Sequence, residues 1–178
     1  QHKQTMANTV QEAANKALTK VKEKGRAAYR AALKNGSDDV SEVQVQDVFD
    51  RLEDLKKQYN TKDTAAYISA IQSRLFEAGD TPTFRKSALN IDENLREEMV
   101  GYTPPDRNAS AAKQLTKRMN KEIDTILKDT IFKSDTPVGQ AKAAMRKIME
   151  EEYDPLSKSV IGDLAGRGPR ADKNAARD

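Results

Sequence analysis

The feature that most constrains this chain is the recurrence of single apolar residues every three or four positions in an otherwise polar sequence. The pattern is clearest after residue 40, where six apolar side chains share one helical face: Val45, Val48, Phe49, Leu52, Leu55 and Tyr59. Such spacing predicts an amphipathic α-helix, because it puts the apolar residues on one side of a 3.6-residue turn. A stripe this narrow is buried only when another helix covers it.

The composition limits how such stripes are buried. Aromatic residues make up 5% of the 178 residues, hydrophobic residues 37% and charged residues 33%, and the mean hydropathy is -0.84. A chain with so few large apolar side chains cannot fill a thick core, but it can line narrow seams between helices. We therefore expect an all-α fold, either an elongated antiparallel helical bundle or a short array of helical hairpins, with a disordered C-terminal tail.

Capping signals predict where the first helices begin and end. A helix over residues 4–34, with a stripe of mostly alanine, ends at Asn35-Gly36, since both residues tolerate the left-handed conformation of a helix end. The Ser-Glu-Val-Gln segment at 41–44 fits a capping box that opens the second helix. Thr61 can cap a third helix, which Gly79 ends.

Two Asp-Thr-Pro triplets, at residues 80–82 and 135–137, predict further helix starts, with Thr as the N-cap and Pro in the first turn. A duplicated helical hairpin would produce this echo. Repeated use of good N-cap chemistry explains it as well, and helical repeats normally need three copies. We also expect a helix over 109–132, and we expect Asp154-Pro155 to stop the helix that begins at the second triplet.

The Pro-containing segment at 102–108 is the clearest break in the chain. We expect N-terminal helical hairpins over 1–101, a C-terminal hairpin over 109–165 that packs on them, and a flexible tail over 166–178. Because the chain begins at Gln1 and not at Met, we also expect it to be a fragment of a larger protein.

Charge is distributed unevenly along the first two helices. Residues 1–34 carry eight Lys or Arg against two Glu, a net charge of +6, whereas residues 37–59 carry seven acids against three bases, a net charge of −4. Opposite charge and a short connection predict that these helices pack as an antiparallel hairpin. The acids that would then face the basic helix are Asp47, Asp50, Glu53 and Asp54.

The basic side chains of the first helix form the candidate interaction face: Lys16, Lys20, Lys22, Lys24, Arg26, Arg30 and Lys34. Such a ladder can contact phosphates, and Arg167 and Arg170 in the tail are candidate contacts of the same kind. Only Tyr29 interleaves the ladder, so stacking on bases is poorly served. We therefore favour a solvated or protein-facing surface, with nucleic-acid binding as the alternative.

The chain carries no recognisable catalytic or metal-binding pattern. It has no cysteine, and its single histidine is His2, close to the N-terminus. The acids Glu150, Glu151, Glu152 and Asp154 are nearly consecutive, so on a helix they point to different faces and do not converge on one ligand. We expect no catalytic, cofactor-binding or metal-binding residues and no enzyme activity.

No apolar run approaches the length of a membrane span, and no signal peptide is recognisable, so we expect a soluble chain with no assigned compartment. In composition, its Ala-, Lys-, Asp- and Gln-rich hairpins resemble helical internal or scaffold proteins of tailed-phage virions, and equally bacterial effector modules and helical surface domains. The lack of active-site chemistry, the narrow amphipathic stripes and the missing initiator Met favour a non-enzymatic structural or protein-interaction module. Its partners would be other protein chains or other domains of the parent protein, and an oligomer is compatible with this function.

Overall fold

The structure is a computed structural model that describes residues 2–105 and 110–159, with side chains described from Asn8 onward. Six α-helices and one π-helical turn make up most of it: α1 (His2–Leu33), α2 (Glu42–Gln58), α3 (Lys62–Ser73), α4 (Ala88–Gly101), α5 (Ser110–Asp129), α6 (Pro137–Ile148) and η1 (Met149–Tyr153). Two two-residue strands, β1 (Phe76–Glu77) and β2 (Thr83–Phe84), form a small antiparallel hairpin. The predicted all-α fold is confirmed.

The chain packs as two compact units. The second unit is residues 36–140, and the first unit contains the described residues on either side, 2–35 and 141–159. The segment at 102–108 lies within the second unit, between α4 and α5, so contacts group the chain differently from the division expected from composition. The domain boundary that we expected at residues 102–108 remains a prediction. The expected tail over 166–178 lies outside the described residues.

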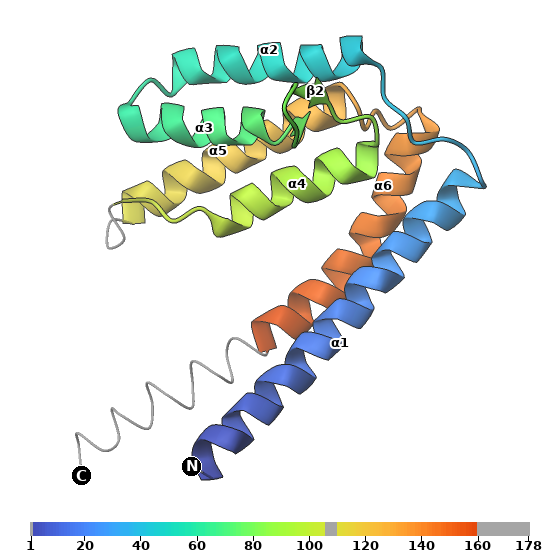
Figure 1. Cartoon of the computed structure of the whole chain (residues 1–178), viewed down its shortest axis with the longest axis vertical. Coiled ribbons are helices and arrows are strands. Elements are labelled where there is room, and N and C mark those ends of the chain that lie inside the picture. The colour runs from blue at the N-terminus through green and yellow to red at the C-terminus, as the bar shows by residue number, and fades with distance from the viewer. Residues whose placement is uncertain (1, 106–109, 160–178) are drawn as a thin grey trace. The chain divides into compact units, whose positions relative to one another are not determined.

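The second unit is a bundle of four helices. Helix α2 packs against α3 and α5, and α3 packs against α4 (Figure 1), while Arg96 of α4 binds Asp124 of α5. The predicted stripes supply its core, and the apolar side chains with no exposed surface are Val45, Val48, Leu52, Ile68, Ile71, Leu75, Ala88, Ile91, Leu95 and Ile123. Narrow stripes thus fill a core once four of them face one axis.

Three predicted N-caps are present in the second unit. Ser41 and Gln44 form the reciprocal capping box of α2, and the Thr61 hydroxyl accepts from the amide of Thr64 at the start of α3. At the second Asp-Thr-Pro triplet, the Thr136 hydroxyl accepts from the amide of Gly139 at 3.1 Å, as expected for an N-cap of α6. Each hydroxyl satisfies an amide that the first helical turn leaves without a partner.

The first Asp-Thr-Pro triplet does not start a helix, so that prediction is wrong. Residues 80–82 lie in the turn between β1 and β2, and α4 begins at Ala88 with Ser87 as its N-cap. An aromatic cluster explains the difference. Phe76 and Phe84 stack across the hairpin with ring centroids 4.7 Å apart, and Phe76 meets Phe49 of α2 edge-on. The triplets therefore have different structures, which argues against a duplicated hairpin.

The same hairpin explains why α3 ends early. We expected Gly79 to end this helix, but α3 ends at Ser73, and the chain then turns into β1. Arg85 fastens the returning strand, because its amide donates to the Leu75 carbonyl at 2.9 Å and its Nε donates to the Arg74 carbonyl at 2.7 Å. Apolar stacking and these bonds override the local helix signal.

The loop that leads into α2 is tied to the start of α4. The Asp38 carboxylate accepts from the Ser87 hydroxyl at 2.8 Å and from the Leu89 amide at 3.1 Å. The Asp38 carbonyl accepts from the Ala88 amide, and the Val40 amide donates to the Lys86 carbonyl. A carboxylate at this position is stabilised by the positive end of the helix dipole.

In the first unit, α1 packs antiparallel to the helix formed by α6, η1 and residues 154–159 (Figure 1). The antiparallel hairpin between α1 and α2 predicted from the sequence is therefore wrong, since α2 buries its stripe against α3 and α5. Helix α1 ends at Leu33, one residue earlier than the expected end at Lys34. The chain leaves the helix there because Lys34 and Asn35 adopt positive φ angles of 52° and 63°.

The prediction that Asp154-Pro155 stops the last helix is also wrong, because residues 154–159 are helical. The amide of Asp154 donates to the carbonyl of Met149, five residues earlier, which is the wide spacing of a π-turn. A proline removes one amide donor and crowds the carbonyl four residues earlier in a regular α-helix. We attribute the continued helix to this wider turn, which leaves room for the Pro155 ring.

Replacing Leu52 by Asp should unfold the second unit. Leu52 has no exposed surface, so the substitution buries a charge without a partner and should cost several kcal/mol, on the order of 4, in free energy of unfolding. Val43→Asp is the matched control on the same helix, because the Val43 side chain is 80% exposed. Urea unfolding followed by circular dichroism measures both, and equal stability of the two variants would contradict the assigned core.

Gly139→Ala should destabilise the turn into α6. A Cβ at residue 139 would overlap the carbonyl oxygen of Lys133, which already accepts bonds from the amide and hydroxyl of Thr136. Overpacking against backbone should cost about 1–3 kcal/mol. Gly101→Ala is the control, since nothing lies within 4 Å of its added Cβ and its stability should change by less than about 0.5 kcal/mol. Thermal melts of both variants test the difference.

Candidate interaction surfaces

Six of the seven basic residues of the predicted interaction face separate into two groups on α1 and directly after it. Lys22 and Lys24 flank the contact of α1 with the helix formed by α6, η1 and residues 154–159, here called the C-terminal helix. Lys24 binds Glu152 with Nζ and Oε1 2.7 Å apart, and the Lys22 ammonium lies 5.4 Å from the centre of the Tyr153 ring. The sequence thus located these two residues correctly on a helix but missed their partners, which lie more than 120 positions away.

The other group points away from that contact. Helical spacing puts Lys16, Lys20 and Arg30 on the side of α1 opposite Gly25, and Lys34 is exposed directly after the helix. These four residues, the α1 basic face, form no ion pair within the part of the chain that the structure describes. Arg26 is also exposed but has an interaction of its own. The proposed tail contacts, Arg167 and Arg170, lie outside the described residues.

The contact between α1 and the C-terminal helix is a seam in which glycine and alanine alternate with larger apolar side chains. Gly25 is buried, and a Cβ there would lie 3.4 Å from Met145 Cγ and 3.5 Å from Met149 Sδ, so the helices approach closely. Tyr29, Ala141 and Met145 are the buried hydrophobic residues of this unit. Other apolar residues along it are only partly covered: Ala14, Ala17, Leu18, Val21, Ala28, Ala32, Leu33, Ala144, Ile148, Met149, Tyr153 and Leu156.

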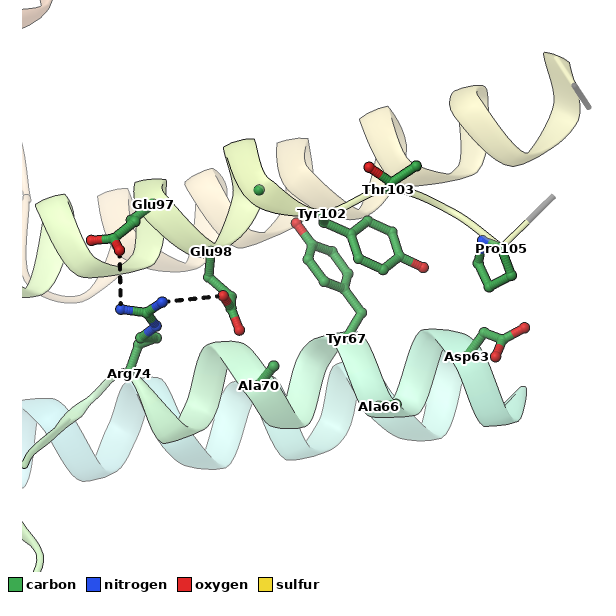
Figure 2. A pocket seen from close by; sticks show the side chains of 11 residues that line it. Asp63, Ala66, Tyr67, Ala70, Arg74, Glu97, Glu98, Tyr102, Thr103 and Pro105 are labelled. Atoms are coloured by element: carbon green, nitrogen blue, oxygen red, sulfur yellow. Dashed lines mark hydrogen bonds and ion pairs between the residues drawn. The ribbon is translucent and has the colours of Figure 1, made fainter. Parts of the chain in front are cut away.

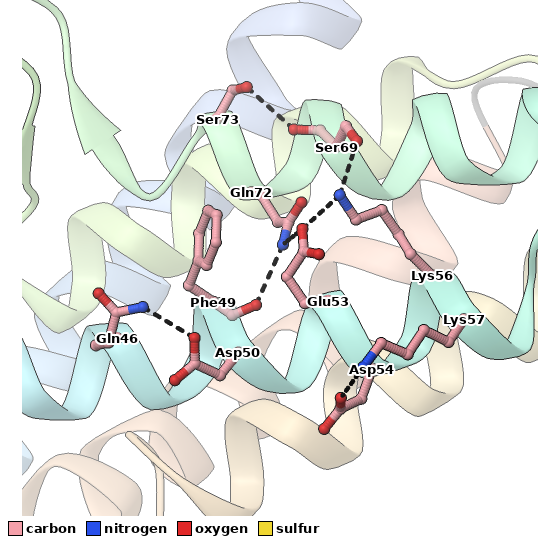
Figure 3. Close-up of polar contacts among 10 residues, drawn as sticks. All are labelled: Gln46, Phe49, Asp50, Glu53, Asp54, Lys56, Lys57, Ser69, Gln72 and Ser73. Carbon is pink, nitrogen blue, oxygen red and sulfur yellow. Dashed lines mark hydrogen bonds and ion pairs between the residues drawn. The ribbon is translucent and has the colours of Figure 1, made fainter.

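The acids of α2, which we expected to face the basic helix, bind within the second unit instead. Asp47 pairs with Arg51, and Asp54 pairs with Lys57, both along α2. Glu53 accepts from Lys56 and from Gln72 of α3, and Gln72 also donates to the Phe49 carbonyl (Figure 3). The hydrogen bonds from Lys56 and Gln72 lower the pKa of Glu53.

An open groove of about 560 Å³ runs between α3 and α4 in the second unit (Figure 2). Arg74 lies at one end, with its guanidinium 3.6 Å from Glu97 and 3.4 Å from Glu98. Tyr67 and Tyr102 stack in its middle with ring centroids 3.9 Å apart. Arg74 holds both glutamates at this end, and the stacked tyrosines give the middle of the groove an aromatic surface.

The tyrosines of the second unit serve packing. The Tyr67 hydroxyl donates to Asn120 of α5, and burial raises the pKa of Tyr67. Burial also raises the pKa of Tyr102 and, together with the nearby Glu122 carboxylate, the pKa of Tyr59. All three phenols therefore stay neutral at ordinary pH.

A charged cluster joins α4 to α5. Arg96 binds Asp124 across the helices and lies 3.5 Å from Asp92, one turn earlier on its own helix, and Asp92 is only 3% exposed. Burial alone would lower the pKa of Arg96, but the hydrogen bond to Asp124 and the charge of Asp92 outweigh it and raise that pKa. This cluster links α5 to α4 within the bundle.

Helix α5 presents a second basic surface, which sequence reasoning missed. Its exposed cationic residues are Lys113, Lys117, Arg118, Lys121 and Lys128, here called the α5 basic stripe. The signal was available, because Lys113, Lys117 and Lys121 follow the same four-residue spacing as the ladder on α1. Three acids in the same helix obscured it in a charge count.

No protein-family model matches this chain, and comparison with curated proteins and with solved structures likewise finds no similar protein. Within residues 2–105 and 110–159, no three His, Cys, Asp or Glu side chains are grouped so that they could hold a metal ion. None of the helices in these ranges has the length and apolar content that crossing a bilayer requires. That the chain is not an enzyme and uses no cofactor stays a prediction.

Arg96→Leu should weaken the bundle more than loss of an exposed ion pair. The substitution leaves the carboxylates of Asp92 and Asp124 facing each other, and it should cost about 2–4 kcal/mol. Arg51→Leu removes an i,i+4 pair in which both side chains are nearly half exposed, and it should change stability by less than about 1 kcal/mol. Urea unfolding of both variants at equal salt measures the difference, and equal losses would contradict a structural role for the cluster.

Proposed function

We propose that this chain is a non-enzymatic structural or protein-interaction module, of the kind found in virion components or in effector and surface proteins, and that its interaction element is the first unit. The partner is another protein chain or another domain of the parent protein. The observation that carries the proposal is the partly covered seam between α1 and the C-terminal helix.

This seam differs from the core of the second unit. Four helices bury the apolar stripes there, whereas α1 and its partner helix leave apolar residues partly exposed on both flanks. Two helices alone cannot enclose a core, because each stripe is wider than the line of contact between them. A third helix against Ala17, Val21 and Ala28 would complete the seam, and small side chains there let it approach closely.

Nucleic-acid binding through α1 is the second candidate function. The four residues of the α1 basic face are exposed and form no ion pair in the described chain, which supports this candidate. The partly exposed apolar seam has no place in phosphate binding, and it is the reason we put a protein partner first.

Site-specific photo-crosslinking tests the protein-interaction proposal. A photoreactive residue at Ala17 lies on the seam, whereas one at Ala27 lies on the exposed side of the same helix and is the matched control. In cells that produce the chain, we expect one discrete protein adduct from position 17 and none from position 27, because only the seam meets the partner. The partner is then purified and its affinity for the chain measured.

Substitution separates the interaction from folding. Ala17→Glu should weaken the measured affinity at least about tenfold, because it places a charge in an apolar contact, while Ala27→Glu should leave it unchanged. Both variants should keep the unfolding transition of the second unit. Equal adducts from both positions, or an affinity that Ala17→Glu does not change, would contradict the proposal.

A further inference from the structure

Two of the three acids of α5 have partners on neighbouring helices, and one of these two, Asp124, lies in helical register with Lys121 and Lys128. Asp124 binds Arg96 of α4, and Glu122 accepts from Gln58 of α2 at 3.4 Å, so two of its three acids have partners on other helices of the bundle. The third, Asp129, is the last residue of the helix. The ion pair with Arg96 thereby neutralises the acid that lies in register with the lysines of α5.

What remains outside is cationic along most of the helix. Lys113, Lys117 and Lys121 repeat every four residues, which separates them by about 6 Å along the axis. Arg118 and Lys128 are exposed beside this row, and none of the five forms an ion pair within the described chain. The other exposed residues between Lys113 and Lys128 are uncharged and polar, namely Gln114 and Thr125.

The surroundings make this stripe unusual. Residues 36–140 carry 19 acids against 15 bases, so the unit as a whole is negative. On α2 the bases pair with acids along the helix, as in the Asp47–Arg51 and Asp54–Lys57 pairs, and the acids outnumber the bases. The α5 basic stripe is a local surface of one sign on a unit of the opposite sign.

The chemistry of the stripe favours phosphate over protein. Protein interfaces are depleted in lysine and need an apolar centre, which the stripe lacks. Phosphate contacts need exposed ammonium or guanidinium groups in a row, helped by hydroxyl and amide side chains, and the stripe has all of these. We infer that the α5 basic stripe contacts the phosphate backbone of nucleic acid without preference for base sequence. This inference is independent of the proposed role of the first unit.

The test is fluorescence anisotropy of the full chain with a short labelled duplex of mixed sequence, titrated between about 50 and 200 mM salt. The triple variant K113Q/K117Q/K121Q should reduce the magnitude of the slope of log K against log salt by about 2.7, since each lost phosphate contact removes about 0.9. Its affinity at the lowest salt should fall at least about tenfold. Glutamine keeps a high helix propensity, so circular dichroism should not change.

The matched control is K62Q/K86Q/K133Q, which removes three exposed lysines from the same unit outside α5 and should leave the slope within about 0.5 of the parent. A duplex of different sequence should bind with the same affinity. No binding at the lowest salt would overturn the inference. So would equal losses in both triple variants, or a loss seen only when the α1 basic face is neutralised. Polyglutamate that competes as well as unlabelled duplex at equal charge would assign the stripe to an acidic protein instead.

Discussion

The structure depends on how little apolar surface each helix offers. A single narrow stripe per helix can be enclosed only when several helices share one axis, and α2, α3, α4 and α5 meet this condition in the second unit. The Phe49, Phe76 and Phe84 cluster closes one end of that core. The first unit has only two helices among the residues that the structure describes, so the apolar flanks of their seam stay partly exposed. The proposed interaction function follows from this difference in packing.

Charge follows the packing. Charged side chains find partners both far away and nearby in the sequence. Lys24 pairs with the distant Glu152, whereas Glu53 pairs with Lys56 on its own helix and accepts from Gln72 of α3. Where the acids of a helix pair with a neighbouring helix, the bases that remain on the first helix dominate its exposed side. The α5 basic stripe arises in this way, because Asp124 is held by Arg96. Surface charge is therefore a consequence of which helices are neighbours.

Local signals in the sequence predicted much of the fold. The capping box at Ser41, the Thr61 cap and the stripe that includes Leu52 appear in the structure as expected, because each depends on residues within one or two turns. The first Asp-Thr-Pro triplet and Pro155 did not behave as their local chemistry suggests. Contacts of Phe76 with Phe49 and Phe84 overrode the first, and a π-turn accommodates the second. Lys22 and Lys24 were placed correctly on a helix, but their partners were not predictable.

The sequence by itself determined the helical class, most of the helix starts and the residues that are buried, because periodicity and capping act over a few residues. Tertiary structure alone decided which stripes meet. Apolar stripes are nearly interchangeable as partners, so neither the short connection nor the opposite charge of the first two helices decided their pairing. Helix α1 instead lies against the C-terminal helix, where Gly25 faces Met145 and Met149. Shape complementarity between distant segments is what local sequence patterns do not encode.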